Sequence, residues 1–228
     1  FLRVIWSELH RIHSHLLWRG LYADAFGFES VFMQFWKIRE RIMDINEATA
    51  GNRVIVSVNQ VGGVRRDLSP SKCRWIIDEL KALEKEMKSL ESTMLSNYTV
   101  KKRTVGKGVL TREMAYELGA AGPTLRGSGI CQDMRQLAYE AFDELDFEPV
   151  VETSGDAYAR GVIRFKETLQ SIDLVRQAIS RMPQGDIGAK VKGKPEGEII
   201  QRVEQPRGEC MYYIKANKTK FLDRLRIR

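Results

Sequence analysis

All three histidines of the chain lie within six residues, in the segment WSELHRIHSHLLW. Imidazole is a common metal ligand and titrates near neutral pH, so this cluster suits either a metal site or proton transfer. On a helix, which turns by about 100° per residue, His10 and His13 share one face, while His15 falls on the opposite, polar side. A zinc site on the first two needs a further ligand that this stretch lacks. We expect His10 and His13 to be half-buried, hydrogen-bonded residues at a helix contact, with a proton-relay role left open.

The three cysteines, Cys73, Cys131 and Cys210, are far apart in the sequence. Their odd number and the lack of a C-x-x-C pair argue against a disulfide framework and against a metal site made of cysteines alone. We therefore expect a reducing, cytoplasmic environment.

Two further motifs suggest ligands but lack the required pattern. RGSGICQD (126–133) resembles a phosphate-binding loop only loosely, because it lacks the Lys-Ser/Thr of a P-loop and the G-x-G-x-x-G order of a dinucleotide fold. We expect a loop in which glycine permits close backbone packing. DELDFE (143–148) lacks EF-hand spacing, so we expect a solvated or arginine-paired acidic loop.

Helical periodicity accounts for most of the chain. In 2–18 apolar residues recur at spacings of three and four, and the Arg-Gly pair at 19–20 predicts an interruption. A second helix, 24–49, is apolar over more than half its girth, which predicts burial or a partner surface. The other predicted helices are 70–96, capped by Ser-Pro, 111–118, capped by threonine, and 154–181.

Strand composition appears in two places. VIVSV and the following VGGV predict a β-hairpin near 53–64, and short β-like runs are found at 198–204, 210–216 and 221–227. We predict an α+β, mostly α fold, a long-helix bundle with small antiparallel β additions. Residues 1–190 would form the helical core and 191–228 a loop with short strands. The first residue is not methionine and the last lies in a predicted strand, so we expect a fragment of a longer subunit.

The formal net charge is +7. Apart from KKRTVGKG (101–108) and the last turn of the chain, the basic residues are scattered, and no aromatic-studded basic element is evident. We expect a solvated or subunit-facing surface and no nucleic-acid partner. No apolar run approaches the roughly 20 residues that span a bilayer.

Several stretches, in order along nearly the whole chain, carry a family resemblance. They are RVIWSELHRIHSHLLW (3–18), GFESVFMQFWKIRERIMDINEATAGNR (27–53), GGVRRDL (62–68), LGAAGPTLRGSGICQDMR (118–135), DELDFEPVVETSGDAYAR (143–160), RMPQGDI (181–187) and EQPRGECMYYIKANKTKFLDRLRIR (204–228). They resemble the shared core of the quinone-site (49 kDa, D) subunit of respiratory complex I and the large subunit of membrane-bound nickel-iron hydrogenases. Within that superfamily the resemblance favours the energy-converting, Ech-like hydrogenases and the formate hydrogenlyase large subunit.

The resemblance implies a helical bundle that belongs to a complex of several subunits. The parent subunit would hold a nickel-iron centre through two C-x-x-C pairs, which are expected upstream of Phe1 and downstream of Arg228. The fragment itself would hold no metal and no cofactor, and would be inactive alone. Its expected partners are a small iron–sulfur subunit and membrane-arm subunits, at the cytoplasmic face of the membrane. When isolated, it is expected to self-associate through apolar surface meant for partners.

Two positions distinguish the branches within this resemblance. In QPRGE the hydrogenase pattern has arginine after proline, above the metal site, and complex I usually has lysine; this chain has Arg207 after Pro206. The quinone-reducing branch has aspartate at the position of Ala25, whereas here the aspartate is one residue earlier, Asp24. Both features favour a hydrogenase with Arg207 as catalytic residue. The alternatives are a quinone-site subunit of an NADH-quinone oxidoreductase, and a scaffold that has lost its metal site.

The resemblance also marks residues around that centre. Those expected next to the metal site or on a proton path are His10, His13, Asp24, Glu29 and Pro206. Those expected to form buried ion pairs that lock the bundle are Arg126, Asp156 and Arg160. Without the family, the simplest role for Arg207 is a strand-end ion pair with Glu204 or Glu209.

Overall fold

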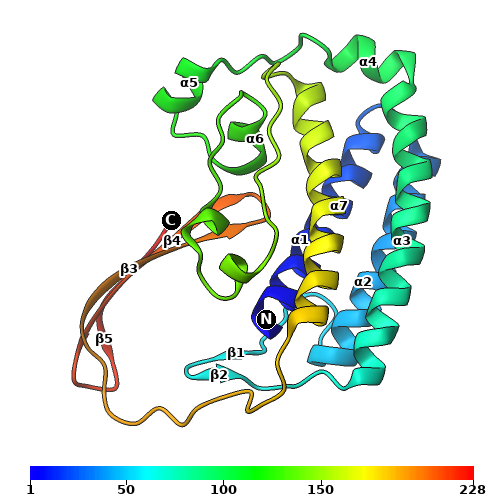
Figure 1. The fold of residues 1–228 in the computed structure, drawn as a ribbon. Coiled ribbons are helices and arrows are strands. Elements are labelled where there is room, and N and C mark those ends of the chain that lie inside the picture. The colour runs from blue at the N-terminus through cyan, green and yellow to red at the C-terminus, as the bar shows by residue number, and fades with distance from the viewer.

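The computed structural model describes residues 1–228 and contains a four-helix bundle, a cap of short helices and a three-stranded sheet (Figure 1). The α-helices are α1 (Leu2–Asp24), α2 (Glu29–Ala50), α3 (Pro70–Ser96), α4 (Tyr98–Thr104), α5 (Arg112–Glu117), α6 (Gly122–Arg126) and α7 (Ala157–Arg181). The strands are β1 (Asn59–Gln60), β2 (Gly63–Val64), β3 (Glu196–Gln205), β4 (Gly208–Asn217) and β5 (Leu222–Ile227), and two 3-10 turns are η1 (Met134–Leu137) and η2 (Phe142–Glu144). The mostly α, α+β prediction is confirmed.

Helix α1 is the centre of the bundle, because it packs on both α2 and α7, and α3 closes the bundle against the same two helices. The predicted stripe of α1 is buried, with Ile5, Leu9, Ile12 and Leu16 at 0% exposed. No helix of the structure combines the length and the apolar character needed to cross a membrane.

The predicted interruption of the first helix at 19–20 is wrong, since α1 continues to Asp24. Gly20 is a packing position: a Cβ there would lie 2.7 Å from Cδ1 of Trp36 on α2. Arg19 is buried and forms an ion pair with Glu91 of α3. The Arg-Gly pair therefore forms the contacts of α1 with α2 and α3. Asp24, which we expected to begin the second helix, ends the first.

The predicted ends of the other helices depend on caps that the structure contains. Gly51 adopts a left-handed conformation with φ 85° and ends α2. The hydroxyl of Ser69 accepts a hydrogen bond from the amide of Lys72 at the start of α3. Thr111 caps α5 in the same way. The last long helix begins at Ala157, later than expected, because Asp156 is its N-cap.

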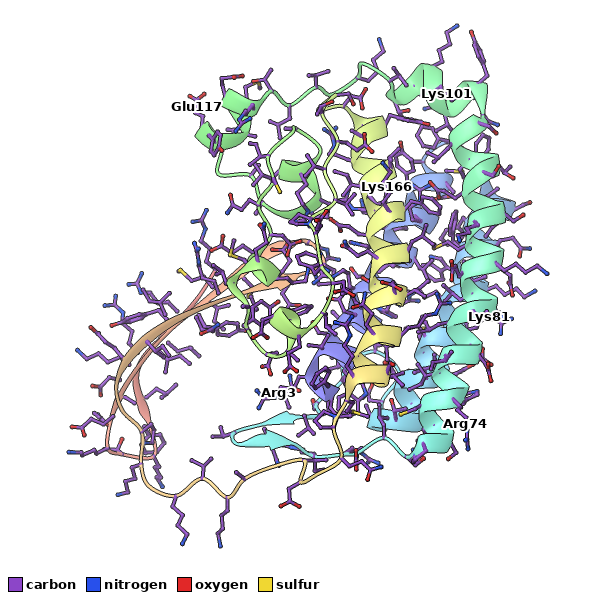
Figure 2. All side chains as sticks on the ribbon, viewed as in Figure 1. Arg3, Arg74, Lys81, Lys101, Glu117 and Lys166 are labelled. Atoms are coloured by element: carbon purple, nitrogen blue, oxygen red, sulfur yellow. The ribbon has the colours of Figure 1, made fainter.

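The strand predicted at VIVSV does not form, and the hairpin is limited to β1 and β2, with Asn59 paired to Val64. The side-chain oxygen of Asn52 accepts hydrogen bonds from the amides of Val54 and Ile55, which occupies backbone groups that a strand would pair. Arg3, labelled in Figure 2, joins the start of α1 to the hairpin by donating to the carbonyls of Gln60 and Gly63, each at 2.9 Å.

The three C-terminal strands form where predicted, as an antiparallel sheet with β4 in the middle. Ile199 of β3 pairs with Ile214 of β4, which pairs in turn with Leu225 of β5. Figure 1 shows that this sheet reaches the bundle only at the β3–β4 turn and extends away from the helices at its other end.

Candidate functional site

The most distinctive feature of the interior is a set of ionisable side chains that water does not reach. We call it the buried charge cluster; its members are Glu8, Arg11, His15, Arg126, Asp133, Arg135, Glu167 and Glu204, each at most 2% exposed. They come from α1, α6, the loop before η1, η1 itself, α7 and β3. The cluster is therefore the place where the bundle, the glycine-rich segment and the sheet are joined.

Arg126, at the end of α6, is at the centre of the cluster. Its guanidinium lies 2.8 Å from a carboxylate oxygen of Glu204, 2.7 Å from Glu167 and 3.1 Å from Asp133. The same group donates to the carbonyl of Gln132 at 2.9 Å. One cation thus satisfies carboxylates from a strand, a helix and a loop, which agrees with the ion-pair role expected for Arg126.

A second part of the cluster is built around Glu8 of α1. Arg135 bridges Glu8 at 3.2 Å and Asp133 at 2.7 Å. Arg11, one turn along α1 from Glu8, pairs with it at 3.1 Å, and the hydroxyl of Ser171 donates to it at 2.6 Å. Glu8 therefore has partners on three elements, and these outweigh its burial, so its pKa lies below the usual value.

His15 belongs to the cluster, in contact with α7. Its Nε2 lies 2.8 Å from a carboxylate oxygen of Glu167. Burial lowers the pKa of His15 to about 4 despite this hydrogen bond, so the ring is neutral at pH 7 and donates its N–H to Glu167. The helical geometry placed His15 opposite His13 correctly, but the polar side of α1 is buried.

The charges of the cluster do not balance if every carboxyl is ionised, since four carboxylates face three guanidinium groups and a neutral His15. Burial and the neighbouring Asp133 raise the pKa of Glu204 above its usual value. The pKa of Asp133 is lowered instead, because the hydrogen bond and charge of Arg135 outweigh the effect of burial. Glu204 is therefore the member that takes up a proton most readily.

The β3–β4 turn follows Glu204 directly, and α1 and α6 hold its backbone. The guanidinium of Arg11 donates to the carbonyl of Glu204 at 2.9 Å and to that of Gln205 at 3.1 Å. Gly208 has φ +133° and Gly122 has φ +63°, and a Cβ on Gly122 would lie 2.5 Å from the Cα of Gly208. Only glycine permits this backbone approach, so the turn has a fixed position on the bundle.

Arg207 lies at the tip of this turn, exposed, while Pro206 before it is buried. The expected alternative, an ion pair with Glu204 or Glu209, is wrong. Glu204 pairs with Arg126, and Glu209 pairs with Arg202 at 3.4 Å. The structure thus holds the backbone of Arg207 rigidly and leaves its guanidinium without an ion-pair partner.

His10 precedes Arg11, the residue of α1 that holds this turn. Burial lowers the pKa of His10, and the positive charges of Arg11 and Arg207 lower it further. The rings of His10 and His13 are stacked with centroids 6.0 Å apart. Arg39 of α2 donates to Nε2 of His13 at 2.7 Å, and burial together with that cation lowers the pKa of His13 to about 4. Both imidazoles are therefore neutral at pH 7, and His13 joins α1 to α2.

The remaining expected residues lie elsewhere. Asp24 ends α1 and Glu29 begins α2, both exposed. The rise of a helix places Asp24 about 20 Å along α1 from His10. Neither residue is brought to Arg207.

Arg160 and Asp156 do not form the expected ion pairs. Arg160 donates to the carbonyls of Gly155 at 2.7 Å and Gly108 at 3.0 Å. Asp156 is buried and accepts hydrogen bonds from the amides of Gly106 and Ala159, each at 2.8 Å. Both residues fix the loops at the start of α7, so they have a structural role based on backbone groups.

The glycine-rich and acidic loops have the simpler of their expected roles. In the first, the amide of Gly155 donates to the carbonyl of Gly127 at 2.8 Å, and a Cβ on Gly127 would lie 3.2 Å from Cγ of Arg160. Gly127 therefore permits close packing against Arg160, and Gly129 supplies a left-handed residue with φ +82°. In the acidic loop, Asp146 pairs with Arg181 of α7 at 2.5 Å, which confirms an arginine-paired loop.

A nickel-iron centre does not fit the residues of this chain. No three His, Cys, Asp or Glu side chains gather in a group able to hold a metal ion. The free thiols are on separate elements: Cys73 is buried at the start of α3, Cys131 is exposed in a loop, and Cys210 is half-buried on β4. The chain therefore supplies no thiolate set of the kind that nickel and iron require.

The buried charge cluster joins the long-helix bundle to the C-terminal sheet. This arrangement defines a scaffold protein that exposes one cation, Arg207, in the β3–β4 turn. The sequence profile of the respiratory-chain NADH dehydrogenase 49 kDa subunit matches residues 25–194. The chain belongs to this family.

Its relatives include hydrogenases as well as quinone reductases. The membrane-bound hydrogenase subunit alpha of Pyrococcus furiosus is 38% identical, over 96% of this chain and 55% of that protein. The carbon monoxide-induced hydrogenase of Rhodospirillum rubrum is 37% identical, over 100% of this chain and 64% of that protein. The C/D subunit of the NADH-quinone oxidoreductase of Phocaeicola vulgatus is 35% identical, over 100% and 45%. The chain thus spans between 45% and 64% of these relatives.

The sequence interpretation missed most of the buried charge cluster. Glu8, Arg11 and His15 are separated by three and four residues along α1, the spacing of residues on one helix face. A charged helix face usually indicates a solvated surface, so the pattern gave no sign of burial.

Proposed function

We propose that this chain is the part of a hydrogenase-type oxidoreductase subunit that holds Arg207 at the reacting centre, in a protein that interconverts protons and hydrogen. The observation that supports this most is the β3–β4 turn, which is fixed from both sides yet leaves the guanidinium of Arg207 without an ion-pair partner. Two of the relatives most similar to the chain are named as hydrogenases.

The chemistry proposed for this chain uses its own side chains. An arginine guanidinium keeps its positive charge at physiological pH and presents a rigid fork of donors, so Arg207 supplies a fixed cation to the reacting centre. His10, which precedes Arg11 on α1, has a lowered pKa, so it is neutral at pH 7 and can accept a proton. His13 and Arg39 continue the polar contacts toward α2. The donor residues for nickel and iron are proposed to lie outside this chain.

Quinone reduction is the second candidate, because the matching family profile and the Phocaeicola vulgatus relative carry that activity in their names. A cation beside a neutral histidine also suits a quinone headgroup, whose oxygens become anionic on reduction. A scaffold subunit without metal is the third. In each case we propose iron–sulfur and membrane-arm partner subunits and a peripheral position on the cytoplasmic face of the membrane.

The test uses the complete protein in its native complex, with Arg207→Lys compared with Arg202→Lys, an exposed β3 arginine away from the turn. We expect Arg207→Lys to retain folding and nickel but to lower hydrogen evolution at least 100-fold, because lysine lacks the planar fork. The control should change it less than twofold. Nickel analysis, hydrogen evolution and quinone reduction are measured together. Wild-type turnover in nickel-replete Arg207→Lys would sink the proposal, and a nickel-free complex that reduces quinone would establish the second candidate.

A further inference from the structure

The C-terminal sheet has two faces of opposite chemistry, as its register shows. Directly paired residues share a face, and successive residues alternate. The apolar face contains Ile199, Gln201, Val203, Cys210, Tyr212, Ile214, Ala216, Leu222, Leu225 and Ile227. The charged face contains Glu198, Ile200, Arg202, Glu204, Glu209, Met211, Tyr213, Lys215, Arg224 and Arg226.

Several side chains of the charged face have partners within the chain. At its root, Glu204 joins the buried charge cluster. Further along, Arg202 pairs with Glu209, and the hydroxyl of Tyr213 donates to Glu198 at 2.7 Å. Its other cations, Lys215, Arg224 and Arg226, are exposed, so the outer part of this face is a solvated basic surface.

The outer part of the apolar face is uncovered, although Ala216 is buried and Ile214 is half-buried. Ile199 is 58% exposed, Leu225 50% and Ile227 58%. Figure 2 shows side chains that project from the sheet where it extends away from the helices. A sheet with one apolar face is stable when a second layer covers it, and a continuous exposed apolar face marks an interaction site. The apolar face therefore has the composition of an interface, and no second layer from this chain packs on it.

The charge of the chain is concentrated in the same segment. Residues 190–228 contain 11 of the 37 Lys and Arg residues but only five of the 30 Asp and Glu residues, so they carry +6 of the formal +7. Lys218 and Lys220 lie in the β4–β5 turn, and Lys192 and Lys194 lie in the loop before β3, which the amide of Lys218 joins by a hydrogen bond to the Pro195 carbonyl. These lysines lie at the free end of the sheet, where Lys218 also pairs with Glu196 at 2.8 Å.

We propose that the apolar face of the β3–β4–β5 sheet is a docking site for a partner protein whose contact surface is apolar and bordered by Asp and Glu. Complementary charge around an apolar centre is the usual anatomy of a specific protein interface. This inference concerns assembly and holds for any reaction that the complete protein catalyses.

Two other occupants fit the observations less well. A second copy would bring two +6 segments together, and like charges at an interface are unfavourable. An anionic bilayer contacts one side of a structure and attracts it through basic groups spread along that side. On the strands Lys215, Arg224 and Arg226 lie on the opposite face, and the basic residues near the apolar face are confined to its free end.

Ile199 and Ile200 make a matched pair for the test. They are the same residue type, adjacent on β3, 58% and 61% exposed, and on opposite faces. In the complete protein expressed in its native host, we expect Ile199→Lys to reduce at least tenfold the share of the protein that elutes with its complex in gel filtration. Ile200→Lys should stay within twofold of wild type. Circular dichroism of the 228-residue chain checks that each variant folds.

A photo-crosslinking amino acid, p-benzoylphenylalanine, at 199 or 200 identifies the occupant without relying on the lysine variants. We expect a crosslink from 199, and none from 200, to a different protein, at a peptide in which Asp and Glu outnumber Lys and Arg. The proposal is overturned by equal effects at both positions, by a crosslink to a second copy or to the same polypeptide, or by wild-type assembly of Ile199→Lys. Binding of the chain to phosphatidylglycerol vesicles that Ile199→Lys abolishes would assign the face to a membrane instead.

Discussion

Arg126 and Glu204, which are 78 residues apart in the sequence, form an ion pair of 2.8 Å in which both side chains are at most 2% exposed. The pair connects α6 to β3, and Arg126 holds Glu167 of α7 at the same time. A single guanidinium therefore joins the sheet to two helices, together with the contacts that Arg11 and Gly122 make to the β3–β4 turn. Because β3 leads directly into the turn that carries Arg207, this pair also determines where that arginine lies.

Arg126→Leu should lower the free energy of unfolding by about 3–5 kcal/mol, because it leaves buried carboxylates without their cation. Urea titration of the chain, followed by circular dichroism, measures the loss.

Arg41→Leu is the matched control, since Arg41 also bridges two carboxylates, Glu79 and Glu86, at 2.8 Å, but is 35% exposed. An exposed pair contributes about 0–1 kcal/mol. Equal losses in the two variants would show that the buried charge cluster does not organise the fold.

The sequence predicted helices and strands better than it predicted tertiary contacts. Apolar spacing fixed the stripe of α1 and local caps fixed the ends of α2, α3 and α5, because both signals are contained within a few residues. Gly20 looked like a helix breaker because the close approach of Trp36 depends on tertiary packing. In the same way, the spacing of Glu8, Arg11 and His15 defines a face but not what covers it.

For the candidate site, a family resemblance indicated a role for Arg207. The sequence could not indicate which residues surround it. Nothing local to QPRGE shows that Arg11 of α1 binds the carbonyls before it, since 193 and 194 residues separate these partners. The expected positions of Asp24 and Glu29 depended on a helix boundary that the structure moved. Long-range contacts of this kind are beyond local patterns.

Stability should fall as the pH is lowered from 6.5 to 4.5, and His15 should cause a defined part of the loss. The pKa of His15 is about 4 in the folded chain and near 6.5 when unfolded, so in this range the unfolded state binds a proton that the folded state does not. Stability that depends on neutral His15 is present above pH 6.5 and is lost as the pH falls toward 4, by about 2 kcal/mol over this interval. Urea titrations at several pH values measure it.

His15→Gln, which keeps a donor toward Glu167, should lose about 2 kcal/mol less than wild type over the same interval. Glu8 and Glu167 have pKa values lowered from 4.5 in the folded chain, so their contribution is lost below this window and does not obscure the histidine. An unchanged pH slope in His15→Gln would contradict the assignment.

The 228-residue chain should retain no nickel after expression in nickel-replete cells and desalting. Its three cysteines are on separate elements, and its stacked His10 and His13 have no third ligand beside them. Elemental analysis by mass spectrometry should find less than about 0.1 nickel per chain, because a soft, thiolate-rich site is absent. Stoichiometric nickel that persists through gel filtration would refute this expectation.

Gly208→Ala should destabilise the chain by moving the turn that carries Arg207. A Cβ on Gly208 would lie 2.8 Å from the amide nitrogen of Gly122, in addition to the strain at φ +133°. Gly197→Ala is the control, because Gly197 lies on the same sheet with φ +99° but a Cβ there would meet nothing within 4 Å. Overpacking lowers the free energy of unfolding by about 1–3 kcal/mol. In urea titrations, Gly208→Ala should therefore be less stable than Gly197→Ala by about this amount. In the complete protein it should also lower turnover while Gly197→Ala does not, because only the first displaces the turn that carries Arg207. Equal stability and equal turnover in the two variants would mean that the contact between Gly122 and Gly208 does not position the turn.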